Sequence, residues 1–160
     1  MQNPKKLPHV SIISAEQRLK MTDATNHWKV RTSTIDEIHI AIQNCIEVDP
    51  ERVLDEAETL LEFFVTLLSD QNFKIVLMTL SIINLVIGMP RHLERQKLSL
   101  DEEPSDWSAS EKPTIYLSSA SLGKHIPRLV GKLADSKNII RQQAIRALMG
   151  IYLIMRTQST

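Results

Sequence analysis

The chain has 160 residues, of which 42% are hydrophobic and 24% charged, values typical of a single soluble globular domain. Lysine plus arginine equals aspartate plus glutamate at 19 each, so the chain lacks the cationic excess with which basic domains bind nucleic acids. The single cysteine, Cys45, excludes an intrachain disulfide and a metal cluster built on cysteines. The longest apolar run, 75–89, is too short to span a membrane. We therefore expect no nucleic-acid partner and no membrane partner.

Helical patterns and capping signals follow one another along the chain. Residues 1–13 contain two prolines and two lysines and are expected to form a tail or linker, and residues 14–160 are expected to form a single domain. Ser14 with Gln17 forms a capping box, and Asp49-Pro50 is a second start signal, because the aspartate caps free amides and proline lacks the N–H that would go unpaired. The predicted helices cover residues 14–22, 28–45, 50–68, 73–88, 118–134 and 138–156.

Two places interrupt this pattern. The fourth helix is expected to end at Gly88-Met89-Pro90, because glycine followed by proline is a C-terminal stop signal. Residues 91–114, with an acidic run over 101–106, are then predicted to form a flexible insert that carries a short helix over 91–97. Pro127 is expected to kink the helix over 118–134.

An internal repeat organises these helices. The segments 28–38, 73–83 and 138–148 align without a gap, at offsets of 45 and 65 residues. Repeats of the HEAT type are about 40–47 residues long, and the second offset exceeds this by roughly the length of the insert. The aligned columns are Val30, Ile75 and Ile140; Thr34, Thr79 and Ala144; Ile35, Leu80 and Ile145; Ile38, Ile83 and Leu148; and Ile42, Ile87 and Tyr152. The predicted fold is all-α, an α-solenoid of three HEAT-like helix pairs, with an ordinary helical bundle as the alternative.

The turns before these three helices resemble those of a known family. They read Asn26-His27-Trp28-Lys29-Val30-Arg31, Leu68-Ser69-Asp70-Gln71-Asn72-Phe73-Lys74-Ile75-Val76, and Leu133-Ala134-Asp135-Ser136-Lys137 through Arg141-Gln142-Gln143-Ala144. A tryptophan followed by lysine and then, three residues after the tryptophan, by arginine resembles the first turn of a TOG domain. TOG domains are HEAT-repeat arrays of microtubule regulators such as CLASP and crescerin. The resemblance covers residues 14–156 and the N-terminal three of the six repeats of a TOG domain.

The resemblance implies a binding surface along the turns. In that family the turn edge binds tubulin, so the resemblance implies a tubulin-binding or microtubule-binding module that regulates microtubule dynamics or organisation. It also implies a cytoplasmic, cytoskeletal location, with the cilium or centrosome as a narrower expectation. Carried over by position, the contact residues are Trp28 and Lys29 in the first turn, Asn72, Phe73 and Lys74 in the second, and Lys137 and Asn138 in the third.

Structural roles compete with these binding roles. Trp28 could fill a groove between helices, Phe73 could be core or exposed, and the lysines could be ordinary solvated charges. Arg31 and Arg141 are expected to reach back to aspartates or helix carbonyls. Asp70 and Asp135 are expected to cap the following helices, and Asn72 and Asn138 are first of all turn residues. The lysines, if free on a rigid edge, would suit an acidic partner.

Other function classes find less support. The five histidines lack metal-site spacing and the four glycines are isolated, so we expect no enzyme, no cofactor and no metal. The alternative function is a HEAT-repeat scaffold that binds a peptide or another subunit on its concave face. The last helix pair would leave Ile145, Leu148, Tyr152 and Met155 uncovered, and we expect these side chains to favour self-association.

Overall fold

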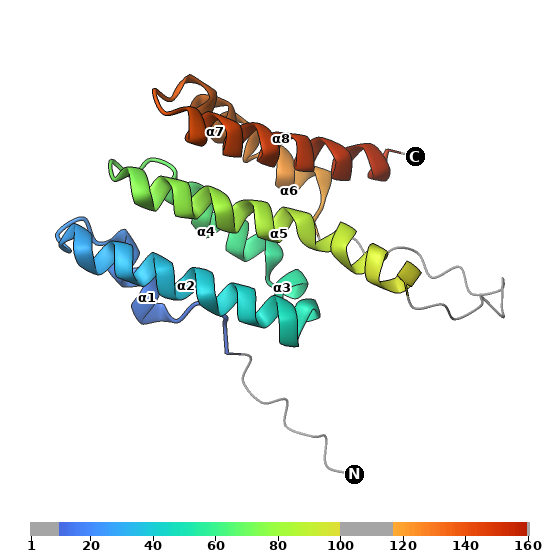
Figure 1. Ribbon diagram of the computed structural model, residues 1–160, viewed down its shortest axis with the longest axis horizontal. Helices are drawn as coiled ribbons and strands as arrows, with labels where there is room; N and C mark the ends of the chain where they lie inside the picture. Colours follow the sequence, from blue (N-terminus) through green and yellow to red (C-terminus); the bar gives the residue numbers. More distant parts are fainter. Residues whose placement is uncertain (1–9, 100–116, 160) are drawn as a thin grey trace, which may run out of the picture.

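The computed structural model describes residues 10–99 and 117–159, and over these residues the protein is all-helical and contains no strand (Figure 1). The helices are α1 (Ala15–Thr22), α2 (Trp28–Val48), α3 (Pro50–Asp55), α4 (Ala57–Leu67), α5 (Phe73–Ser99), α6 (Ser119–Gly123), α7 (Ile126–Gly131), the short 3-10 helix η1 (Lys132–Ala134) and α8 (Asn138–Gln158). The all-α prediction is therefore confirmed for the described part of the chain.

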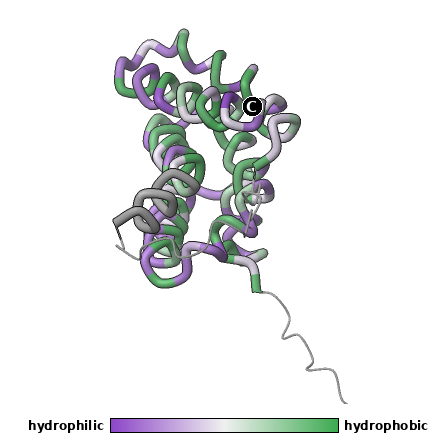
Figure 2. Tube along the Cα trace, turned by 90° about the vertical axis from the view of Figure 1, so that its right-hand side faces the viewer, coloured by the Kyte–Doolittle hydropathy of each residue, from purple (hydrophilic) through white to green (hydrophobic). Residues whose placement is uncertain are grey.

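The helices lie in two layers. The long helices α2, α5 and α8 lie side by side, with α5 packed between the other two (Figure 1). The shorter helices form the second layer: α1 packs on α2, α4 on α5 and α7 on α8. Seen from the side, the two layers stand next to each other, and each contains both hydrophobic and hydrophilic residues (Figure 2).

The aligned columns of the sequence are buried in two of the three long helices, α2 and α5. Ile35, Ile38 and Ile42 of α2 are at most 1% exposed, and their counterparts in α5, Leu80, Ile83 and Ile87, are at most 3% exposed. The small residues of the second column, Thr34, Thr79 and Ala144, are also buried, which lets the helices approach closely. Val30 differs from Ile75 and Ile140 in its aligned column, because at the first turn of α2 this side chain is 42% exposed whereas the other two are buried.

Local capping fixes most helix starts where the sequence places them. The Ser14 hydroxyl accepts the N–H of Gln17 at 3.1 Å and the Gln17 side chain accepts the N–H of Ser14 at 3.1 Å, so the capping box is confirmed. Asp49 accepts the N–H of Arg52 at the start of α3. The single helix predicted over 50–68 is divided at Glu56, which links α3 to α4.

The segment before α1 belongs to the packed domain rather than to a free tail. Residues 1–9 lie outside the described part of the chain. The N–H of Ile12 donates to Oε2 of Glu56 at 3.1 Å, Arg52 donates to the carbonyl of Val10, and Ile13 is buried. Hydrogen bonding therefore begins at Val10 and apolar burial at Ile13, both before the capping signal at Ser14.

The prediction that the fourth helix ends at Gly88-Met89-Pro90 is wrong. Helix α5 continues through Pro90 to Ser99, so residues 91–99 of the predicted insert are helical, and 100–114 lie outside the described residues. A proline inside a helix removes one hydrogen bond and costs about 3 kcal/mol. Val86, Ile87 and Met89 are buried immediately before it, and the packing of that turn outweighs the local stop signal.

The kink predicted at Pro127 is a complete break. The helix predicted over 118–134 consists of α6, α7 and η1, and the break falls at Lys124-His125. Pro127 then stands in the first turn of α7, where the missing N–H has no intrahelical partner to lose.

Candidate functional site

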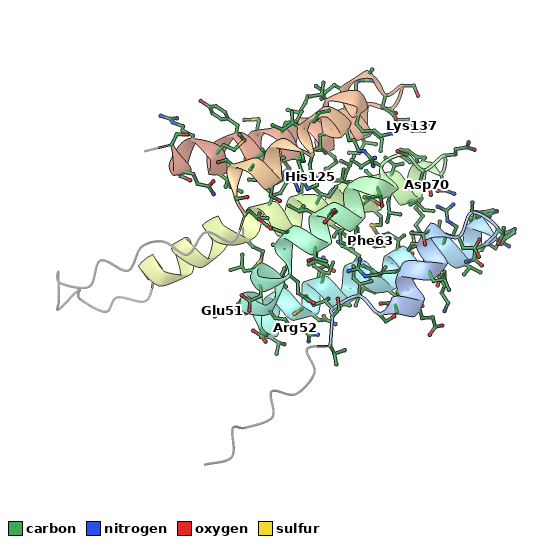
Figure 3. All side chains as sticks on the ribbon, turned by 180° about the vertical axis from the view of Figure 1, so that it is seen from behind. Glu51, Arg52, Phe63, Asp70, His125 and Lys137 are labelled. Carbon is green, nitrogen blue, oxygen red and sulfur yellow. The ribbon has the colours of Figure 1, made fainter. Side chains whose placement is uncertain are left out.

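The N-terminal ends of α2, α5 and α8 come together at one edge of the molecule. All three long helices begin on the same side, and the turns that lead into them follow one another along that side (Figure 1). We call the residues 26–31, 70–76 and 135–141 the turn edge. Asp70 and Lys137, from the second and third turns, lie at this same end when the molecule is seen from behind (Figure 3).

Trp28 is the first residue of α2 and is 53% exposed. The imidazole of His27 occupies the N-cap position and accepts the N–H of Lys29 at 3.2 Å, and its ring lies 5.6 Å from the ring of Trp28. The Lys29 ammonium lies 5.7 Å from the centroid of the indole. Of the two roles open to Trp28, the structure favours the surface role, because the ring lies against a neighbouring lysine and not inside a helix groove.

Phe73, the first residue of α5, is 40% exposed. The ammonium of Lys137, which is the N-cap residue of α8, lies 4.7 Å from the centroid of its ring. A cation at this distance is attracted to the face of an aromatic ring. The second and third turns are thus linked through an aromatic side chain and a lysine that both remain accessible.

Asn72 and Lys74 have local partners. The Asn72 side-chain oxygen accepts the N–H of Lys74 at 2.9 Å and that of Ile75 at 3.3 Å, so this residue caps α5. The ammonium of Lys74 lies 2.9 Å from Oδ2 of Asp36 on α2. This ion pair offsets part of the positive charge that Lys74 could offer to an acidic partner.

Arginines and aspartates hold the turns in place. Arg31 forms an ion pair with Asp70 of the following turn, and Arg141 donates to the carbonyl of Asp135 at 2.7 Å, so the expected structural role of both arginines is confirmed. Asp70 does not cap a helix directly. It accepts the N–H of Asn72 at 2.8 Å, inside the turn. Asn72 takes the cap position in its place.

The third turn repeats this arrangement without the cap. Asp135 accepts the N–H of Lys137 at 2.9 Å, so it too stabilises the turn and not the helix start. Asn138 accepts a hydrogen bond from Arg141 at 3.3 Å, and α8 has no side-chain cap. Asn138 therefore serves the geometry of its own turn.

The structure thus divides the seven predicted contact residues into two groups. Trp28, Lys29, Phe73 and Lys137 combine exposed aromatic rings with neighbouring lysines, whereas Asn72, Lys74 and Asn138 have partners within the protein. Sequence reasoning missed His27 and Asp36. His27 stands directly before the helix, and this position could have indicated a cap. Asp36 and Lys74 lie on different helices and are 38 residues apart in the sequence, so no local pattern predicts that they pair.

The thiol of Cys45 and the possible metal ligands complete the description of the polar groups. Cys45 is half-buried against the core, and this burial raises the pKa of its thiol, which disfavours a nucleophilic thiolate. Among the side chains that the structure describes, within residues 10–89 and 117–159, no three of His, Cys, Asp or Glu are placed to share a metal ion. Over the same residues, no helix combines the length and the apolar character that crossing a bilayer requires.

The chain was compared with protein families, curated proteins and solved structures. No protein-family model matches the chain, and no curated protein or solved structure shows significant similarity to it.

Proposed function

We propose that this protein is a tubulin-binding module that regulates microtubule dynamics or organisation, and that it recognises αβ-tubulin through the turn edge. The observation that carries the proposal is the exposed indole of Trp28 at the first turn, with the ammonium of Lys29 beside it. An exposed tryptophan is a strong anchor in protein interfaces, because its large apolar ring can be fully desolvated by a partner. Such a module would act in the cytoplasm, at the cytoskeleton.

The proposal includes a HEAT-like solenoid of three helix pairs. The pairs would be α1 with α2, α3 and α4 with α5, and α6 and α7 with α8. The equivalent columns in α2 and α5 are both buried, and α2 packs on α5 as α5 packs on α8, which supports a repeated stacking mode. Stacking of this kind would place the three turns of the turn edge next to one another in a rigid row.

The charges of the turn edge favour an acidic partner. Lys29 and Lys137 lie on successive aromatic rings, and neither is held in an ion pair with a carboxylate of the described residues in the way that Lys74 is held by Asp36. Positive charges in a row attract an acidic surface and accelerate association. We therefore assign the electrostatic part of recognition to Lys29 and Lys137, and a smaller part to Lys74.

The test is co-elution with αβ-tubulin in size-exclusion chromatography with light scattering at low salt. The wild-type chain should form a complex that weakens as salt is added, because exposed charges are screened. Trp28→Ala should lose the complex, and Lys29→Glu combined with Lys137→Glu should lose it as well. Matched controls are Val48→Ala, an exposed apolar side chain at the opposite end of α2, and Lys124→Glu, an exposed lysine outside the turn edge. Absence of a complex with the wild type, or a complex that survives both turn-edge variants, would reject the proposal.

A second candidate function is a scaffold that binds a peptide or a subunit on the face of the long helices. A groove of about 260 Å³ lies between α5 and α8 and is lined by Asn84, Ile87, Gly88, Arg146, Met149, Gly150 and Leu153. Gly88, where a Cβ atom would meet nothing within 4 Å, leaves room for a bound backbone, and Arg146 could pair with a carboxylate. Arg146→Glu should abolish binding to a partner of this kind, whereas the turn-edge variants should not affect it.

A further inference from the structure

The first helix pair shows how a long helix of this protein is covered by its neighbour. Ile35, Ile38 and Ile42 of α2 are buried, and α5 packs on this helix. Beside this apolar column, Arg31 forms an ion pair with Asp70, which lies in the turn just before α5. This side of α2 therefore binds two features of its neighbour together: an apolar helix and an aspartate in the turn that precedes that helix.

Helix α8 carries the equivalent positions, and two of them are exposed. Arg141, Ile145, Leu148 and Tyr152 stand at the repeat positions of Arg31, Ile35, Ile38 and Ile42, each 110 residues further along the chain. Ile145 is 48% exposed and Tyr152 is 62% exposed. Leu148 and Tyr152 also line a groove of about 510 Å³ by the C-terminal half of α8, together with Met155, Arg156 and Ile126 of α7. We call Arg141, Ile145, Leu148 and Tyr152 the α8 outer face.

We propose that the α8 outer face docks a helix pair of a partner protein, whose second helix is apolar and whose turn carries an aspartate that pairs with Arg141. The model for this interface is inside the protein itself, in the pairing of Arg31 with Asp70 and in the packing of α5 on α2, whose apolar column is buried. In the isolated chain Arg141 donates to its own turn, to the carbonyl of Asp135 and to Asn138. An incoming aspartate would give this guanidinium the partner that Arg31 already has.

The charges of α8 make a second copy a poorer occupant. The helix contains Arg141, Arg146 and Arg156 and no acidic residue, so symmetric pairing of two α8 helices would bring like charges together. They favour instead a partner that supplies carboxylates.

Head-to-tail stacking of two copies is also unfavourable. Helix α8 packs on α5 through Gln143 and Gly150, which contact Asn84 and Ile87. The corresponding face of α2 contains Ser33, Glu37 and Ile40, all exposed. Placed on the α8 outer face, Glu37 would be buried against apolar side chains without a matching charge, at a substantial desolvation cost.

The test extends the full chain at its C-terminus with a flexible linker and a second copy of its own residues 49–99, the unit that covers the equivalent face of α2. If the proposal is correct, the appended unit docks on α8, and the extended chain unfolds in one cooperative thermal transition with a higher midpoint than the original chain. Ile145→Asp in the extended chain should separate the transition into two. Gln142→Asp, at an exposed position on α8 outside this face, is the matched control and should leave a single transition.

A double-mutant cycle tests the charged part of the interface. Arg141→Ala and Asp70→Ala in the appended copy should each lower the midpoint of the extended chain, and the two together should lower it no further than one alone. Arg141→Ala in the original chain lowers the thermal midpoint only through the contacts of Arg141 within its own turn. This decrease is subtracted from the decrease measured in the extended chain. Independent unfolding of the appended unit, or additive effects in the cycle, would overturn the proposal. A dimer of the original chain that Tyr152→Asp returns to monomer would also overturn it, in favour of a second copy. None of these readouts depends on tubulin, so the two proposals fail separately.

Discussion

The guanidinium of Arg31 on α2 forms an ion pair with the carboxylate of Asp70 in the turn that leads into α5. Both side chains are largely buried, with 16% and 6% of their surfaces exposed. The same carboxylate accepts the N–H of Asn72, whose own side chain caps α5. One aspartate therefore fixes the geometry of the second turn and joins it to the first helix pair.

Breaking this ion pair should be strongly destabilising. Removing one partner leaves the other charge buried without compensation, which costs about 3–5 kcal/mol. Arg31→Ala should lower the free energy of unfolding by an amount of this order, and Asp70→Ala should lower it further, because it also removes the acceptor for the N–H of Asn72. Urea denaturation monitored by far-UV circular dichroism measures both.

The control for this pair is the more exposed contact between Lys74 and Asp36. Its side chains are 54% and 36% exposed, and exposed ion pairs contribute about 0–1 kcal/mol. Lys74→Ala should therefore have little effect on stability. Equal losses for Lys74→Ala and Arg31→Ala would show that burial does not decide the energetics of these contacts.

Thr79 and Thr34 occupy the same repeat position and should respond oppositely to valine. The Thr79 hydroxyl is buried and has no hydrogen-bond partner in the described structure, whereas the Thr34 hydroxyl donates to the carbonyl of Val30 at 2.8 Å. Because an unsatisfied buried hydroxyl costs about 1–3 kcal/mol, Thr79→Val should raise the free energy of unfolding. Thr34→Val should be neutral or slightly destabilising. Chemical denaturation of the two variants in parallel checks the sign, and a loss of stability in Thr79→Val would contradict the expectation.

Gly150 should not tolerate a methyl group. A Cβ atom at this position would lie 2.7 Å from Cγ2 of Ile87, so α5 and α8 would have to move apart. Overpacking of this kind costs about 1–3 kcal/mol, and Gly150→Ala should lower the thermal midpoint. At Gly88 a Cβ would meet no atom within 4 Å, and alanine there should stabilise the helix by about 0.5–1 kcal/mol. A similar response of the two variants would argue against close packing of α5 on α8.

Acidification should destabilise the protein through His125. Burial of this ring lowers its pKa below the ordinary value of 6.5, and the nearby Lys124 and Arg128 act in the same direction, opposed by Glu62. The unfolded chain then binds more protons than the folded one, so this group lowers the free energy of unfolding as the pH falls below about 6.5. His125→Gln should make the pH dependence of urea denaturation shallower over that range. Proton NMR titration of the His125 ring checks the direction of the shift, and a pKa above 6.5 would reverse the prediction.

Much of the fold could be predicted from the sequence, because the signals are local. Ser14 with Gln17 and Asp49-Pro50 specify helix starts by their own chemistry. The repeated columns at Ile35 and Leu80 identified packing faces, since a buried stripe leaves a regular pattern along a helix. The exposed indole of Trp28, by contrast, could not be read from the sequence. A tryptophan at a helix start is compatible with either environment, and only the three-dimensional arrangement decides between them.

The features that escaped prediction depend on contacts between distant segments. Helix α5 continues through Pro90 because the preceding turn is packed, which a local stop signal cannot reveal. The pairing of Lys74 with Asp36 and the placement of Lys137 over Phe73 join residues from different turns. These contacts determine which predicted site residues remain available for binding. The sequence therefore predicted which residues lie at the turn edge, but not which of them are engaged in contacts within the protein.

The central position of α5 has a consequence for local opening of the structure. This helix is covered by α2 on one side and α8 on the other, and α4 packs on it from the second layer. The helices at either end of the molecule can therefore unfold locally while those at the other end stay folded. The central helix α5 becomes exposed to solvent only on global unfolding. Amide hydrogens in the buried part of α5 should exchange most slowly with solvent. Those of α1 and α7 should exchange much faster, because local opening begins at the two ends of the helix array.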